Sequence, residues 1–287
     1  MDLKNTAFRS DLILDVGMHN GDDTAFYLRK GFRVVAVEAN PALVERAKQR
    51  FRSEISSGKL TVVGKAVSDE PGPVELWIND KNDEWSSLSR RYVDRNDRVG
   101  AKSRSARVPS VEFGQLMETY GIPYYLKIDI EGLDHLCINA LHGFSNRPKY
   151  VSVETSGIND LSDTCDLIDN LCVLGYNRFK LVNQYMHRRI RLPDPPREGV
   201  YVDHRFDGFA SSGPFGEETP GDWESEEQVI AKYEKVLPLQ AKHTIQGENF
   251  RPVLSMLYYR LHDLFRLEPV GWYDIHAKIE SANTNER

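Results

Sequence analysis

Three charged residues, Lys127, Asp129 and Glu131, alternate with apolar ones in the segment YYLKIDIEGLD. An alternation of period two predicts a β-strand that directs all three charged side chains to one face. Charges buried without partners are costly, so they must pair with one another or reach a cleft where the strand ends. An ion pair between Lys127 and Asp129 would be purely structural. For Asp129 and Glu131, beside Gly132, we favour a cleft, where a carboxylate can act as a general base.

A second group of polar residues follows the apolar run at 12–16, in DVGMHNGDD. Gly17 permits a tight exit from a strand, and Gly21 permits close contact where a helix begins. Glu38 ends the next β-branched run, 23 residues after Asp15. An acid at that position can bond the vicinal hydroxyls of a ribose. The two segments together predict a site for a ligand that contains adenosine.

The nature of that ligand depends on the charges around the turn. A dinucleotide site requires the pattern G-x-G-x-x-G, which this turn lacks. Three acids, Asp15, Asp22 and Asp23, would repel a pyrophosphate and suit the sulfonium and amino groups of S-adenosylmethionine. The alternative for Asp22 and Asp23 is to cap the helix. His19 stands where a middle glycine is expected; it can contact the cofactor, gate the acceptor or bond local backbone.

The elements that position these residues alternate between strand and helix. This alternation predicts an α/β fold of Rossmann-like, doubly wound type with a mostly parallel sheet. We predict an S-adenosylmethionine-binding core over residues 1–183 and a helical and irregular C-terminal cap of the same domain over 184–287. Strands are expected at 12–16, 33–38, 60–67, 124–130, 150–155 and 178–182, and helices at 22–31, 41–51, 110–121, 133–141, 162–174, 225–237 and 252–267.

Three segments have a less regular pattern. Residues 74–80 predict an edge strand, and the arginine-rich stretch 81–107 predicts a long loop. The segment RFDGFASSGPFGEETPGDW fits either a substrate lid or a plain surface loop. The last predicted helix carries one apolar stripe, made of Leu254, Leu257, Leu261, Leu264 and Phe265.

Composition narrows the classes of partner. The chain has 287 residues, a formal net charge of −6 and a pI near 5.8, which gives no reason to expect a nucleic-acid partner. It has no apolar run of membrane-spanning length and no signal-peptide pattern, so we expect no membrane partner and a cytoplasmic location. The three cysteines lack metal-ligand spacing and predict reduced thiols. A homo-oligomer is compatible with this sequence.

Five motifs together resemble a known family. LDVGMHNGDDT, VVAVEANP, KAVSDEPG, the SSL at 86–88 and LKIDIEGLD occur in the order and spacing of the FkbM-family S-adenosylmethionine-dependent methyltransferases. The resemblance covers roughly 12–182, and LKIDIEG is its most specific part. It implies O-methylation of a hydroxyl on a sugar or another natural product.

The resemblance also assigns roles to residues. It implies that Asp15, Gly17 and Gly21 hold the methionine part of the cofactor, that Glu38 binds the ribose, and that Asp129 lies beside the transferable methyl. The segment 66–68 would flank the adenine. The full set of expected cofactor-binding residues is Asp15, Gly17, His19, Gly21, Thr24, Glu38, Ala39, Asn40, Ala66, Val67, Ser68 and Asp129.

Methyl transfer from a sulfonium is an in-line displacement, in which the enzyme aligns the acceptor and a general base helps a weakly nucleophilic alcohol. Asp129 is the first candidate for the base, followed by Glu131 and His135. Asp129, Glu131 and Asp134 could instead hold Mg²⁺, but they match no recognised cage spacing and we assign no metal ligand. Three rival functions are N-methylation, a catalytically silent adenosine-binding protein and, against the pattern of the first turn, a nicotinamide-dependent dehydrogenase.

Overall fold

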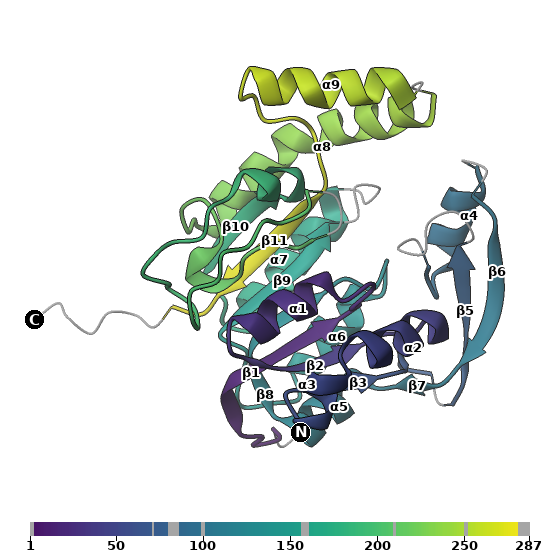
Figure 1. The fold of residues 1–287 in the computed structure, drawn as a ribbon, viewed down its shortest axis with the longest axis vertical. Coiled ribbons are helices and arrows are strands. Elements are labelled where there is room, and N and C mark those ends of the chain that lie inside the picture. The colour runs from purple at the N-terminus through teal and green to yellow at the C-terminus, as the bar shows by residue number, and fades with distance from the viewer. Residues whose placement is uncertain are drawn as a thin grey trace, which may run out of the picture.

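The structure, a computed structural model, describes residues 3–70, 72–79, 86–98, 101–155, 161–208, 211–249 and 252–280. Its centre is a seven-stranded sheet in the order β10-β11-β9-β8-β1-β2-β3 (Figure 1). All pairings are parallel except those of β11, which runs antiparallel to both neighbours. The predicted mostly parallel α/β fold is confirmed. The strands are β1 (Phe8–Val16), β2 (Arg33–Val37), β3 (Leu60–Val63), β8 (Ile122–Ile128), β9 (Tyr150–Thr155), β10 (Arg178–Asn183) and β11 (Tyr273–Lys278).

Helices and ordered loops cover both faces of this sheet. The alternation in β1 shows why: Leu12, Leu14 and Val16 join the core beneath one layer of helices, while Ile13 joins the core on the other face. The first layer contains α5 (Phe113–Tyr120), α6 (Asp134–Leu141), α7 (Leu161–Val173) and the start of α8 (Glu226–Asn249). The second contains α1 (Asp22–Arg29) and α2 (Pro41–Arg50), with the short α3 (Arg52–Ser56) after them.

Local sequence explains how the helices beside the site begin. Asn40 caps α2 by accepting a hydrogen bond from the Ala42 N–H, and Pro41 occupies the first helical position. Gly21 precedes α1 with a φ of 82°, a left-handed conformation that glycine adopts without strain. Both helices therefore start close to the carboxyl ends of β1 and β2. The strand order reverses between β1 and β8, because β2 and β3 follow on one side of β1 while β8 and β9 lie on the other. Doubly wound α/β sheets bind their ligands at such a point.

The arginine-rich stretch is more regular than the predicted loop. Its described residues form α4 (Arg90–Arg98) and β6 (Ser103–Val108), and β6 pairs antiparallel with β5 (Val74–Asn79). Two parts of it, 81–85 and 99–100, lie outside the described residues. The loop prediction is wrong elsewhere because the apolar residues of β5 and β6 form a small core of their own. The described part of the predicted edge strand, 74–79, thus pairs with β6 and does not join the main sheet (Figure 1). We call the described residues of 74–108 the arm.

Other boundaries also differ from the prediction. The expected strand at 60–67 is divided into β3 and β4 (Ala66–Val67), and β4 pairs with β7 (Ser110–Val111) in a separate small sheet. The helix predicted at 110–121 consequently starts at Phe113, and the strand predicted at 124–130 is displaced to 122–128.

The C-terminal part contains the main element that the prediction missed. β11 lies between β9 and β10, so residues after 183 complete the central sheet (Figure 1). This part also includes two 3-10 helices (Gln184–Arg189 and Gly216–Glu218), α8, which passes through Pro238, and α9 (Pro252–Leu264). Within the described ranges, no helix combines the length and apolarity that a bilayer crossing needs.

Candidate active site

A cavity opens at the carboxyl ends of β1, β2, β8 and β9, where the strand order reverses. It collects residues from the first turn, from the arm and from the C-terminal part. Eight predicted site residues line it: Gly17, His19, Glu38, Ala39, Ala66, Val67, Asp129 and Glu131. Six others are not part of its lining: Asp15, Gly21, Thr24, Asn40, Ser68 and His135.

The first turn packs against the end of β8 with no room for a side chain. Gly17 has a φ of 86°, and a Cβ on it would lie 1.7 Å from the carbonyl oxygen of Asp129. His19 also has a positive φ, 51°, and its backbone N–H donates to Glu38 Oε2 at 2.9 Å. The turn is therefore joined by its backbone both to the end of β8 and to the acid after β2.

Glu38 is held by two backbone groups. Besides the His19 N–H, the Asn40 N–H donates to Oε1 at 2.7 Å. Burial raises the pKa of Glu38, and these two hydrogen bonds oppose that rise. The carboxylate is thus fixed in orientation at the cavity wall, as a ribose-binding acid must be.

A buried charge network lies beneath the turn. Lys127 Nζ donates to the Gly17 carbonyl at 2.6 Å and lies 3.4 Å from Asp15 Oδ1 and 3.6 Å from Asp129 Oδ2. Thr24 Oγ1 donates to the other oxygen of Asp15 at 2.5 Å. Burial lowers the pKa of Lys127, but Asp15 and then Asp129 outweigh it and hold the pKa above its usual value. Asp15 and Thr24 consequently support the turn from below, and the predicted ion pair between Lys127 and Asp129 is present.

The two acids at the start of α1 have different environments. Asp22 is exposed; its N–H donates to the Asn20 side chain at 2.8 Å, and its carboxylate pairs with Arg50 at 2.7 Å. Asp23 is buried at the cavity wall, where it accepts hydrogen bonds from the Ser211 hydroxyl and the Ser212 N–H. Burial raises the pKa of Asp23 to about 6, although Lys127 lowers it. The segment predicted as lid or loop therefore attaches to α1 through Asp23.

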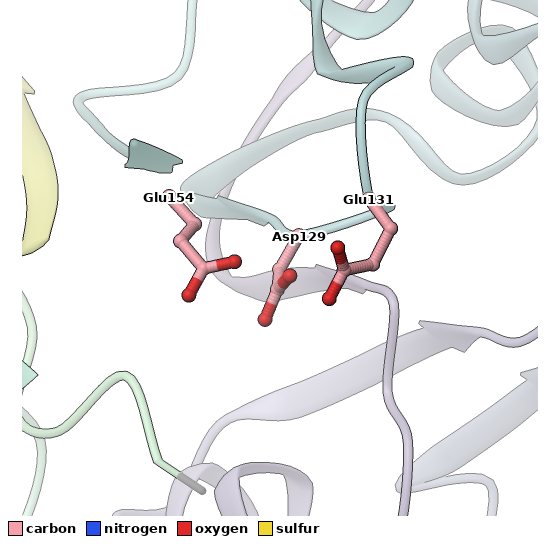
Figure 2. A group of neighbouring side chains, drawn as sticks. All are labelled: Asp129, Glu131 and Glu154. Atoms are coloured by element: carbon pink, nitrogen blue, oxygen red, sulfur yellow. The ribbon is translucent and has the colours of Figure 1, made fainter. Parts of the chain in front are cut away.

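Three carboxylates of the cavity lining, those of Asp129, Glu131 and Glu154, lie close together (Figure 2). One oxygen from each of Asp129, Glu131 and Glu154 lies within 4.8 Å of the others. Glu131 has a φ of 52°, and Ser87 of the arm donates to its carbonyl at 2.6 Å. A Cβ on Gly132 would collide with the ring of Tyr92 at 2.4 Å, so the arm packs directly on this turn.

Glu154 is the residue of this group that sequence reasoning missed. It ends β9, and Gln184 Nε2 donates both to its Oε1, at 3.3 Å, and to Asp274 Oδ1, at 2.8 Å. Burial raises the pKa of Glu154 well above its usual value, and the charges of Asp129 and Glu131 raise it further. An acid at the end of a β-branched run was the available signal, as it was for Glu38.

Two other predicted residues are used differently. Asp134 accepts hydrogen bonds from the N–H groups of Ile130 and Gly132, at 3.0 and 3.1 Å, and so stabilises the turn before α6 instead of joining the carboxylate group. His135 is exposed on α6 and outside the cavity lining. The lining also includes residues outside the predicted site set, from the arm and the C-terminal part: Leu76, Ser86, Ser87, Leu88, Tyr92, Gln184, Ser211, Ser212 and Trp272. Of these, 86–88 are the SSL of the family resemblance, and 211–212 lie in the segment expected as a lid or a surface loop.

The fold and this cavity define a Rossmann-like domain with a ligand site at the reversal of strand order. The family model described as "Methyltransferase FkbM domain" matches residues 15–189. The chain belongs to the FkbM methyltransferase family. The family predicted from the five sequence motifs is thereby confirmed.

Individual relatives are distant. A probable ribosomal RNA small subunit methyltransferase A of Methanospirillum hungatei is 39% identical over 66 residues, which span 23% of this chain and 26% of that protein. A precorrin-6y C5,15-methyltransferase from Geobacter metallireducens is 13% identical, with 61% of this chain and 68% of that chain covered and a TM-score of 0.35. A methyltransferase from Geobacter sulfurreducens in complex with S-adenosyl-L-homocysteine is 10% identical, with coverages of 95% and 86% and a TM-score of 0.33.

Proposed function

We propose that the protein is an O-methyltransferase whose acceptor is a hydroxyl of a small molecule, a sugar or another natural product. The observation that supports this most directly is Asp129, a carboxylate that ends β8 and lines the cavity with its side chain 30% exposed. A carboxylate placed there can take the proton of an acceptor alcohol as the new oxygen–carbon bond forms.

We place the adenosine part of the cofactor near Glu38 and its sulfonium near Asp129 and Glu131. Glu38 would accept hydrogen bonds from the ribose hydroxyls, while Ala66 and Val67 would pack against the adenine. S-adenosylmethionine supplies a methyl group on a sulfonium cation. The carboxylates of Asp129 and Glu131 favour that positive charge at the other end, because opposite charges attract strongly in a partly buried site.

The proposed base depends on Lys127. The Nζ atom of Lys127 lies 3.6 Å from Asp129 Oδ2 and orients the carboxylate. The acceptor proton would pass to Asp129 during transfer and then to solvent. The arm, through Ser87 and Tyr92, would exclude water from the reacting atoms.

Calorimetry with S-adenosylmethionine is the first test, followed by transfer of a labelled methyl group to a panel of hydroxyl acceptors. Absence of cofactor binding would contradict the proposal as a whole. Asp129→Asn should keep cofactor binding and lose at least about 100-fold in kcat, the usual contribution of a general base. Full turnover by Asp129→Asn would exclude Asp129 as the base and leave the cofactor assignment intact.

N-methylation is a second candidate, and the convergence of Asp129, Glu131 and Glu154 favours it because an amine acceptor is a cation at neutral pH. The same acceptor panel separates the two when it contains matched amino and hydroxy sugars. NMR of the product identifies the methylated atom.

Binding of Mg²⁺ is a further proposal, in which Glu154 replaces Asp134 as the third ligand. The hard oxygens of Asp129, Glu131 and Glu154 suit Mg²⁺, whereas Asp134 is occupied by backbone N–H groups. If the ion is required, exhaustive treatment with a chelator abolishes turnover and added Mg²⁺ restores it. Turnover that survives the chelator removes Mg²⁺ from the reaction.

The remaining proposals concern partners and compartment. A net charge of −6 supports a small-molecule acceptor over RNA, the substrate that the name of the Methanospirillum relative carries. A gel-shift assay with ribosomal RNA tests this directly. All three cysteines are free thiols, which supports a reducing compartment such as the cytosol.

A further inference from the structure

Four residues of the apolar stripe predicted on the last helix are exposed, and the fifth, Leu254, lies outside the described side chains. Leu257, Leu261 and Leu264 of α9 have exposed fractions of 49%, 43% and 73%. Phe265 and Leu267, directly after the helix, are exposed by 66% and 55%. We call these five residues the α9 stripe. Exposed apolar groups this large and this close together mark an interaction surface more often than a plain solvated one.

The opposite side of α9 is already fixed to the body of the protein. Tyr259 stacks on Tyr185 with ring centres 4.5 Å apart, and the Val270 N–H donates to the Tyr258 hydroxyl at 3.1 Å. Arg189 Nη2 donates to Asp263 at 2.7 Å. These contacts determine the rotation of α9, so the stripe is not a core face that can turn inward.

The position of α9 leaves its stripe accessible. In Figure 1, α8 and α9 form a hairpin at one end of the molecule, beyond the main sheet, and α9 is its outermost element. None of the five stripe residues lines the candidate active site. A partner can therefore bind here without blocking the cavity.

We propose that the α9 stripe is the interface of a homodimer, in which it packs against the same stripe of a second copy. The leucines are spaced by four and then three residues, the spacing with which one helix packs along another. A two-fold axis through the stripe would bury the same patch of both copies in a single interface, as in most soluble dimers.

The area of the stripe agrees with a dimer of moderate strength. From the exposed fractions, the five side chains offer roughly 400 Å² of apolar surface. Since homodimer interfaces are about 65% apolar, each copy would bury roughly 600 Å² in total. The sum for two copies, about 1,200 Å², is at the lower limit for a stable, specific interface.

The charges beside the stripe are mixed in sign. Two arginines, Arg260 on α9 and Arg266 within the stripe, stand near two acids, Asp263 and Glu268. Asp263 also pairs with Arg188 and Arg189. A surface of mixed charge fits a second protein copy better than an anionic lipid, which binds helices with a Lys- and Arg-rich polar face.

Sedimentation velocity of the full chain, from about 1 to about 100 µM, tests the proposal. A concentration-dependent shift from monomer to dimer is expected. Leu264→Gln should weaken dimerisation at least about tenfold, and Leu261→Glu combined with Leu264→Glu should leave a monomer throughout the range. Val173→Glu, at another exposed apolar residue (77%) on α7, is the matched control and should dimerise like the wild type.

Circular dichroism and calorimetry with S-adenosylmethionine show whether each variant is folded. A wild type that stays monomeric at about 100 µM, or stripe variants that are folded and still dimeric, would overturn the proposal. Co-sedimentation of monomeric wild type with vesicles of phosphatidylglycerol would also overturn it and identify a lipid surface instead. Loss of cofactor binding in the wild type would contradict the proposed function without affecting this inference.

Discussion

Replacing Lys127 with methionine tests the buried network beneath the first turn. Methionine keeps most of the side-chain volume but removes the charge and the three donors of the ammonium group. Asp15, which is completely buried, loses the cation 3.4 Å from its Oδ1, and the Gly17 carbonyl loses its 2.6 Å hydrogen bond. Asp129 loses its partner at 3.6 Å.

The expected cost is large because buried charges are left without a partner. Removing one member of a buried ion pair typically costs 3–5 kcal/mol, and we expect about 3 kcal/mol here, since Thr24 still donates to Asp15. For a domain of this size that corresponds to a fall in Tm of roughly 6–10 °C. The control is Lys48→Met, at an exposed ion pair with Glu45, which should change stability by less than about 0.5 kcal/mol.

The cost should depend on pH in a defined direction. Asp23 already has a pKa of about 6 with Lys127 lowering it, so loss of Lys127 raises that pKa further. A carboxyl whose pKa is higher in the folded state than in the unfolded state binds extra protons when folded. The folded variant is therefore favoured at low pH and loses stability as pH rises.

Urea denaturation of the wild type and Lys127→Met at pH 5.5 and pH 8 measures both effects. The stability gap between the two proteins should be smaller at pH 5.5 than at pH 8. A variant as stable as the wild type at pH 8 would show that the network contributes nothing. A gap of equal size at both pH values would show that the loss is one of packing and not of charge.

Three further variants test other parts of the site. Gly17→Ala should abolish binding of S-adenosylmethionine in calorimetry, because its Cβ cannot lie 1.7 Å from the carbonyl oxygen of Asp129; retained affinity would contradict this geometry. Glu38→Ala should weaken cofactor binding by about 10- to 100-fold, the loss expected when a charged hydrogen-bond acceptor is removed, and unchanged affinity would remove it from the ribose site. Asp274 has a pKa raised to about 8, first by burial, so its folded form holds a proton that the unfolded form releases, and it lowers stability between pH 6.5 and 8 by up to about 2 kcal/mol. Asp274→Asn should reduce that decline in urea denaturation; an unchanged slope would show that Asp274 does not titrate there.

Much of the site could be predicted because it depends on short segments. The tight exit at Gly17 and the left-handed Gly21 are properties of single residues. Glu38 and Asp129 each follow an apolar run, and the strands in a parallel sheet end at the same edge. Residue type and local periodicity were sufficient for these positions.

The misses depend on contacts between distant segments. All six side chains of β11 are buried, whereas the alternation of apolar and polar residues in YDIHAK indicates at most a half-buried strand, with Asp274, His276 and Lys278 on a solvated face. Contacts from distant segments accommodate two of these polar side chains: Gln184 donates to Asp274, and Lys278 pairs with Glu217. The two neighbouring strands satisfy the backbone of β11 on both sides. Glu154 takes the place expected for Asp134 for a similar reason: the backbone N–H groups after β8 occupy Asp134, while the pairing of β9 with β8 places Glu154 beside Asp129.

The sequence by itself determined the family, the alternation of strand and helix, and the turn and acids expected at one edge of the sheet. Each of these depends on residues near one another in the chain, where periodicity and backbone preference act directly. The tertiary structure decided which carboxylates meet, how Ser211 and Ser212 hold Asp23, and that the stripe of α9 lies outside the core. Those outcomes depend on the packing of separate segments, such as β8 against β9 or Ser211 against Asp23, 188 residues apart, which no local pattern encodes.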